Sequence, residues 1–64
     1  MLKNLRKIRI KKDLSLQKLS NMTGISTTYL NDLENLNRKN PSYKVMNKLI
    51  KALRVTVEEI EGNK

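Results

Sequence analysis

Lysine and arginine are the side chains whose number and spacing indicate a chemistry in this sequence. Fourteen basic residues against six acidic ones give a formal net charge of +8. Residues 1–12 hold six of the basic residues and no acidic one, whereas Glu58, Glu59 and Glu61 lie near the other end. A field of this sign attracts polyanions, so it favours binding to nucleic acid or to an anionic membrane surface. The alternative is a charged face that serves only solubility.

The groups that most often carry catalysis or bind metals are missing from the sequence. It contains no cysteine and no histidine, so it offers neither a thiolate nor an imidazole as metal ligand or general base. We therefore expect no enzyme activity, no catalytic residue, no metal and no cofactor. No apolar run approaches the roughly 20 residues that span a bilayer, and the N-terminus does not resemble a signal peptide. These absences predict a cytoplasmic protein without a membrane partner.

Five short helices must position any binding groups, because apolar residues recur at helical spacing and no convincing strand is present. The first helix should run from about residue 2 to residue 11. Each of the others should follow a residue whose hydroxyl can accept a hydrogen bond from the first helical turn, namely Ser15, Ser26, Ser42 and Thr56. The expected apolar faces contain Leu2, Leu5 and Ile8, then Leu16, Leu19 and Met22, then Tyr29, Leu30 and Leu33, then Val45, Met46, Leu49, Ile50 and Leu53, and finally Ile60. The two methionines, Met22 and Met46, should fill the core. The pattern predicts a single all-α domain over residues 1–64, with an exposed loop from Leu36 to Asn40.

The second and third of these helices are joined by a tight turn. Gly24 tolerates the positive φ that such a turn needs, and Ser20 is small enough to let two helix backbones approach. Apolar residues suited to lock the two helices together are Leu19, Ile25, Leu30 and Leu33. Over about residues 15–35 this arrangement is typical of a helix-turn-helix, whose second helix, here Ile25 to Asn35, enters the major groove of DNA.

Short motifs extend this pattern along nearly the whole chain. They are Leu5-Arg6-x-x-Arg9, Leu14-Ser15-Leu16-x-x-Leu19, Gly24-Ile25-Ser26, Tyr29-Leu30-x-x-Leu33-Glu34, Pro41-Ser42 and Ala52-Leu53-x-Val55-x-Val57. With these motifs the sequence resembles the Cro/C1-type (XRE) helix-turn-helix family of phage repressors and bacterial regulators, from residue 5 to about residue 60. It is most similar to the bacillar biofilm-repressor type, which shares Ser-Leu-x-x-Leu, Tyr-Leu and Asn-Pro-Ser. The resemblance implies a compact, five-helix, lambda-repressor-like DNA-binding domain.

The resemblance also implies which residues contact DNA. The base-reading positions of the family correspond to Ser26, Thr27, Thr28, Asn31 and Asp32. The phosphate-binding positions correspond to Ser15, Gln17, Tyr29, Asn35, Arg38, Lys39 and Asn40. For Tyr29, packing in the core is an equal alternative, because an aromatic ring at an inner edge can do both. Arg9 and Glu34 align with a structural pair that joins the first helix to the end of the recognition helix. The lysines of the first helix, Lys3, Lys7 and Lys11, are expected to attract DNA at long range rather than touch it.

The chain departs from the family at two positions, where Leu16 replaces a frequent glutamine and Leu36 replaces a frequent glycine in a loop one residue longer. The predicted base-reading residues can also recognise only some of the bases. Thr27 and Thr28 can form hydrogen bonds or contact a thymine methyl group, Asn31 can pair with adenine, and Asp32 can accept from a cytosine amino group. No arginine is available on this helix for guanine.

The expected function is that of a small transcriptional regulator, a repressor, that binds a double-stranded DNA operator sequence-specifically. A homodimer on an inverted repeat would let two recognition helices meet successive major grooves about 34 Å apart, with the dimer contact around Val55, Val57 and Ile60. The alternative is an antitoxin-like protein-interaction module that masks a partner protein. A third alternative is a membrane-active peptide, but this function would account for none of the sequence after residue 12. Control would come from an unknown regulatory protein partner, from abundance, or from a further part of a longer regulator.

Overall fold

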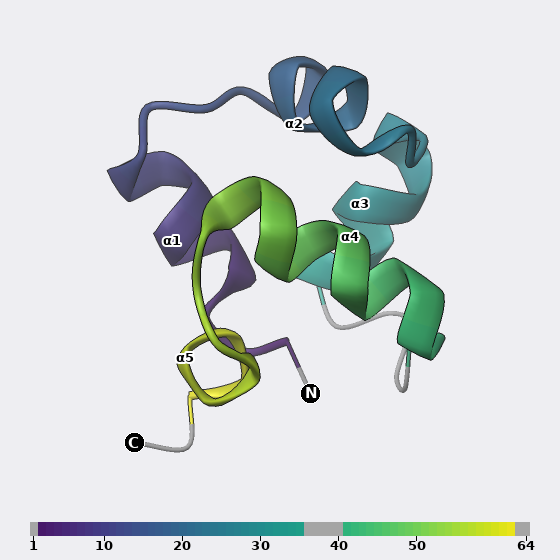
Figure 1. Ribbon diagram of the computed structural model, residues 1–64. Coiled ribbons are helices and arrows are strands. Elements are labelled where there is room, and N and C mark those ends of the chain that lie inside the picture. The colour runs from purple at the N-terminus through teal and green to yellow at the C-terminus, as the bar shows by residue number, and fades with distance from the viewer. Residues whose placement is uncertain (1, 36–40, 63–64) are drawn as a thin grey trace.

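The computed structural model describes residues 2–35 and 41–62 and shows five α-helices there, with no strand among these residues. The helices are α1 (Leu5–Lys11), α2 (Leu16–Thr23), α3 (Thr27–Glu34), α4 (Tyr43–Leu53) and α5 (Val57–Glu61). Figure 1 shows α4 in front of α3, α2 across the top, and α1 and α5 on the left. The predicted all-α, five-helix architecture is therefore confirmed.

Four of the five helix starts follow the predicted capping residues. The hydroxyl oxygens of Ser15, Ser26, Ser42 and Thr56 accept hydrogen bonds from backbone N–H groups of the first turn of α2, α3, α4 and α5. At α5 the cap is reciprocal, because the carboxylate of Glu59 accepts from the backbone N–H of Thr56 at 2.8 Å. These bonds satisfy donors that a helix N-terminus otherwise leaves unpaired.

The first helix begins three residues later than predicted, at Leu5. Asn4, the residue before it, forms no side-chain cap. Its backbone N–H donates to the carbonyl of Ile60 at 2.8 Å, and its side-chain amide donates to the carbonyl of Glu59 at 3.1 Å. The segment before α1 is thus held in a non-helical conformation because it docks on α5.

The core draws its buried side chains from every helix. They are Leu2, Leu5, Leu19, Ile25, Leu30, Leu33, Leu49, Leu53 and Ile60. All of these residues were predicted from the sequence to make apolar contacts inside the domain. Met46, which was also predicted to lie in the core, packs half-buried against them. A buried leucine or isoleucine of this kind contributes about 2–5 kcal/mol relative to alanine. A few such residues therefore decide whether a domain of 64 residues folds.

The prediction that Met22 fills the core is wrong, because its side chain is 47% exposed. The inward position at the end of α2 belongs instead to Thr23, which is buried. The Thr23 hydroxyl donates to the carbonyl of Leu19 at 2.8 Å and accepts from the backbone N–H of Ile25 at 3.1 Å. Met22 lies three residues after the buried Leu19, and Thr23 lies four residues after it. Either spacing can share a helix face with Leu19, and the packing of α2 turns Thr23 rather than Met22 toward the core.

The expected dimer contact around Val55, Val57 and Ile60 is also wrong in part. Ile60 is fully buried in the core of its own chain, and Val55 packs half-buried against that core. Only Val57 is exposed, at 37%. A helix of five residues has no room for two apolar faces, so α5 uses its one inward position to close the domain.

Candidate nucleic-acid interface

The turn between α2 and α3 sets the angle of the two helices. Gly24 ends α2 with φ of +78°, and its backbone N–H donates to the carbonyl of Ser20 at 2.7 Å. A Cβ atom at this position would meet nothing within 4 Å, so glycine is needed for its conformation and not for space. Ile25 then buries its side chain in the core, and α2 packs directly on α3. This is the geometry of a helix-turn-helix.

The third helix presents one polar stripe away from the core. Leu30 and Leu33 are fully buried and hold the inner side of α3. On its other side Thr28, Asn31 and Asn35 are exposed, and their spacing of three and four residues puts them along one line. The structure therefore brings three of the predicted DNA-contacting residues together on one surface.

Three further predicted base-reading residues lie around this stripe. Ser26 is exposed, and its hydroxyl oxygen accepts from the backbone N–H of Tyr29 at 3.1 Å. Thr27 and Asp32 are half-buried, which leaves less of each side chain for a partner than Thr28 or Asn31 has. The outward stripe is therefore the most exposed part of α3.

Two pairs of side-chain amides stiffen the surfaces of α2 and α3. On α3 the amide of Asn35 donates to the side-chain oxygen of Asn31 at 3.3 Å, and on α2 the amide of Gln17 donates to that of Asn21 at 3.1 Å. Both are exposed pairs at a spacing of four residues, which suits helix-surface hydrogen bonds. Asn21 was not singled out from the sequence, although its place four residues after Gln17 was a usable signal.

The predicted phosphate-binding residues divide into those on α2, those on α3 and those in the loop after α3. Ser15 and Gln17 are exposed at the start of α2, where the positive end of the helix dipole favours an anion. Tyr29 is half-buried and packs against the core, so the structure shows its packing role directly. Asn35 belongs to the outward stripe of α3. The remaining three predictions, Arg38, Lys39 and Asn40, lie outside the described residues.

Arg9 and Glu34 form a bidentate ion pair between α1 and the last turn of α3. The Arg9 Nε donates to Glu34 Oε2 at 2.5 Å and Nη2 donates to Oε1 at 3.1 Å, with side-chain exposures of 11% and 3%. Arg9 Nη1 also donates to the carbonyl of Leu14 at 2.7 Å. The hydrogen bonds to Glu34, and its charge, raise the pKa of Arg9 above the ordinary arginine value despite the opposing effect of burial. The pair therefore fixes α3 against α1 and the loop that leads to α2.

The sequence matches the family model of a helix-turn-helix domain over residues 5–60, and this match decides the family of the chain. The chain belongs to the Cro/C1-type helix-turn-helix family. Members of this family are DNA-binding regulators and not enzymes. No curated protein and no solved structure matches the chain.

A membrane-spanning helix and a metal site are two features that the sequence led us not to expect in this chain. Over the part of the chain that the structure describes, no helix is long and apolar enough to cross a membrane. Within those same ranges, no three acidic, histidine or cysteine side chains gather as a group that could hold a metal ion.

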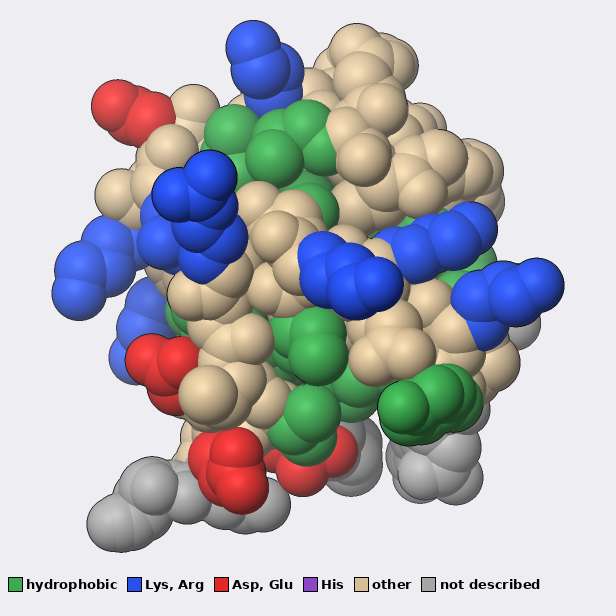
Figure 2. Space-filling model, viewed as in Figure 1, with side chains coloured by type: hydrophobic (Ala, Val, Ile, Leu, Met, Phe, Trp, Pro, Cys, Tyr) green, Lys and Arg blue, Asp and Glu red, His purple; other side chains and the backbone are tan. Residues whose placement is uncertain are grey.

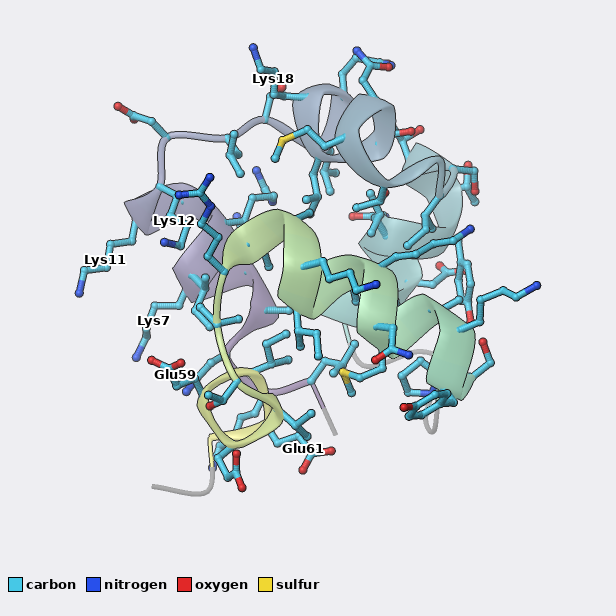
Figure 3. All side chains as sticks on the ribbon, in the orientation of Figure 1. Lys7, Lys11, Lys12, Lys18, Glu59 and Glu61 are labelled. Atoms are coloured by element: carbon cyan, nitrogen blue, oxygen red, sulfur yellow. The ribbon has the colours of Figure 1, made fainter. Side chains whose placement is uncertain are left out.

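The basic residues of this helix-turn-helix domain lie mostly away from the stripe of α3. Helix α3 contains no lysine or arginine but two acidic residues, and α2 contains Lys18 alone. The other basic side chains of the described ranges lie on α1, its flanks and α4 (Figure 2). In Figure 3, Lys7, Lys11 and Lys12 project on the side of α1, and Lys18 projects from α2. The outward stripe of α3 therefore presents neutral polar groups, and the basic charge lies on other elements.

Proposed function

We propose that this chain is a transcriptional repressor that reads an inverted-repeat operator as a homodimer, with α3 in the major groove. The observation that carries the proposal is the outward stripe of Thr28, Asn31 and Asn35 on a helix whose inner side is held by Leu30 and Leu33. A helix held in this way presents the same groups to base edges in every binding event. The proposal places the protein in the bacterial cytoplasm, where such an operator lies.

The stripe suits a site rich in A·T pairs. The hydroxyl and methyl groups of Thr28 can bind a base edge or contact a thymine methyl group, and the amide of Asn31 can pair with adenine. The hydrogen bond from Asn35 holds the side-chain oxygen of Asn31, so less rotational freedom is lost when DNA binds. Ser26, Thr27 and Asp32 flank the stripe and are proposed as additional readers at its edges.

Phosphate contacts in this proposal come from two groups of residues. Ser15 and Gln17 lie at the start of α2 and would hold one backbone segment, supported by the dipole of that helix. The other proposed contacts come from Tyr29, Asn35, Arg38, Lys39 and Asn40. Such contacts set the register of α3 on the duplex without reading its sequence.

The test is selection from a randomised duplex pool at roughly physiological salt, followed by two matched variants of one residue. Thr28→Val keeps a β-branched side chain and a methyl group but removes the hydroxyl, whereas Thr28→Ser keeps the hydroxyl and removes the methyl. We expect convergence on an inverted repeat, with the two variants changing preference at the same position in each half-site but in different ways. A pool that does not converge, or variants that select the wild-type site, would contradict sequence reading by α3.

One observation favours a second candidate, an antitoxin-like module that masks a partner protein. The exposed stripe of α3 carries no basic residue, since Asp32 is half-buried and Glu34 is bound to Arg9, and a neutral polar surface of this kind also suits a protein partner. Salt separates the two functions, because DNA binding that neutralises several phosphates weakens steeply as salt rises and an apolar protein contact does not. A salt-insensitive complex with a protein would favour the second candidate.

A further inference from the structure

A row of basic side chains runs along the exposed face of α4. Lys44, Lys48 and Lys51 are exposed at a spacing of four and three residues, and Arg54 follows them, exposed, at the C-terminal cap. At 1.5 Å per residue the three lysines extend over about 10 Å of helix. Figure 2 shows Lys and Arg side chains in a row across this part of the surface. We refer to these four residues as the α4 row.

The α4 row has no acidic residue on its own helix. Helix α4 packs on α2, which contains no acidic residue, and also on α5, which carries Glu58, Glu59 and Glu61. The glutamates near the end of the chain lie on α5, away from the row in Figure 2. The lysines of α1 lie closer to these glutamates in the view of Figure 3, where Lys7 is on the same side as Glu59. Among the described residues, the α4 row is thus a line of exposed positive charge on a helix that itself carries no acidic residue.

The backbone at Arg54 supports a role for this charge. Arg54 ends α4 in the left-handed conformation, with φ of +59°, which disfavours every residue that has a Cβ atom. The chain uses glycine for the same conformation at the ends of α2 and α5, where φ is +78° and +77°. At α4 it carries an exposed arginine instead. A charged side chain at a strained position points to a use for that side chain.

The α4 row faces away from the outward stripe of α3. Leu30 and Leu33 of α3, and Leu49 and Leu53 of α4, are buried in one core cluster, so the outward sides of the two helices point in different directions. Figure 1 shows α4 on the near side of the bundle and α3 behind it. A straight duplex lying against the stripe of α3 is therefore on the other side of the core from the row.

We propose that the α4 row binds the phosphate backbone of a second duplex, so that one domain joins two segments of DNA. A duplex carries one negative charge per about 1.7 Å of its axis, so several phosphates lie within reach of the row. Lysine is a flexible point charge, which suits a backbone without a fixed sequence, and it is depleted at protein interfaces. For these reasons the row fits a nucleic acid better than an acidic protein. The inference rests on the proposed function for the first duplex.

The experiment measures the two duplexes separately on the full chain. Duplex A, carrying the selected operator, is immobilised and saturated with protein, and a labelled duplex B of unrelated sequence is then added. Occupancy of A reports the proposed function, and retention of B reports the inference. Neutralising three phosphates should make retention of B fall about 40-fold between about 50 mM and about 200 mM salt.

Two variants with the same change in charge decide the outcome. K48E/K51E should keep its occupancy of A, which also shows that it folds, and should lose retention of B by about tenfold or more. K7E/K11E, which alters exposed lysines of α1, should retain B within about twofold of the wild type. Equal loss in both variants, or persistent retention of B by K48E/K51E, would overturn the inference. Occupied A with no retention of B by the wild type would also overturn it and leave an acidic protein as the ligand of the row. Failure of A to bind would instead refute the proposed function.

Discussion

Removal of one partner from the Arg9–Glu34 pair is the sharpest test of how the recognition helix is held. In Arg9→Met the carboxylate of Glu34 loses both hydrogen bonds from Arg9, and the carbonyl of Leu14 loses its donor. The Glu34 side chain is only 3% exposed, so water cannot replace these partners while the domain stays folded. Methionine fills much of the space of the arginine stem, which limits the effect to the lost polar contacts.

The expected cost is large relative to the stability of the domain. Leaving one charge of a buried pair without its partner costs about 3–5 kcal/mol. A domain of 64 residues, at about 0.05–0.15 kcal/mol per residue, has a free energy of unfolding of about 3–10 kcal/mol. Arg9→Met should therefore remove a third or more of the total, and at the low end of that range the variant should be largely unfolded at room temperature. Arg6→Met, an exposed position on the same helix, should change stability by less than about 0.5 kcal/mol.

The double variant Arg9→Met/Glu34→Leu separates the pair itself from the cost of an uncompensated charge. With both partners apolar the buried carboxylate is gone, so most of the lost stability should return, except about 1 kcal/mol for the carbonyl of Leu14. The assay is urea unfolding followed by far-ultraviolet circular dichroism, with the midpoint and slope compared across the four proteins. A loss below about 1 kcal/mol in Arg9→Met, or a double variant no more stable than the single one, would refute the reasoning.

Two further predictions concern residues in the left-handed conformation. Gly24→Ala should lower the free energy of unfolding by about 1–2 kcal/mol, because a Cβ at φ of +78° is strained although it meets no neighbour; a much larger loss in thermal unfolding would indicate a clash that the structure does not contain. Arg54→Gly should raise the free energy of unfolding by about 1 kcal/mol because it relieves the strain at φ of +59°. Unchanged or lower stability of that variant in urea would contradict the strain, and thereby the argument that Arg54 is kept for its charge.

The starts of four helices and the members of the core could be predicted from the sequence because they depend on local features. A serine or threonine before an apolar helix caps it through bonds within three residues, as at Ser15, Ser26 and Thr56. Regular apolar spacing likewise identified the buried side of α3 and of α4. The start of α1 was predicted too early, since Asn4 bonds to the carbonyls of Glu59 and Ile60, more than 50 residues away.

For the candidate site, the sequence alone determined the type of domain and the helix on which the proposed base-reading residues lie. The turn at Gly24 and the apolar spacing on either side of it are local, and they suffice to place α2 and α3. Only the tertiary structure decided which residues of α3 form the outward stripe, because that depends on how far Leu30 and Leu33 turn the helix into the core. It likewise decided that Thr23 and not Met22 faces inward.

The position of the charge was also decided by the tertiary structure. The sequence determined the net charge of +8 and its excess in residues 1–12, and that excess drew attention to the first helix. In the folded chain α1 and α4 both pack on the acidic α5, and the lysines of α4 line up on one exposed face. Charge is additive along a chain, but its field depends on which residues far apart in sequence become neighbours. That neighbourhood is set by the packing of α1 against α5 and of α4 against α2 around a common core.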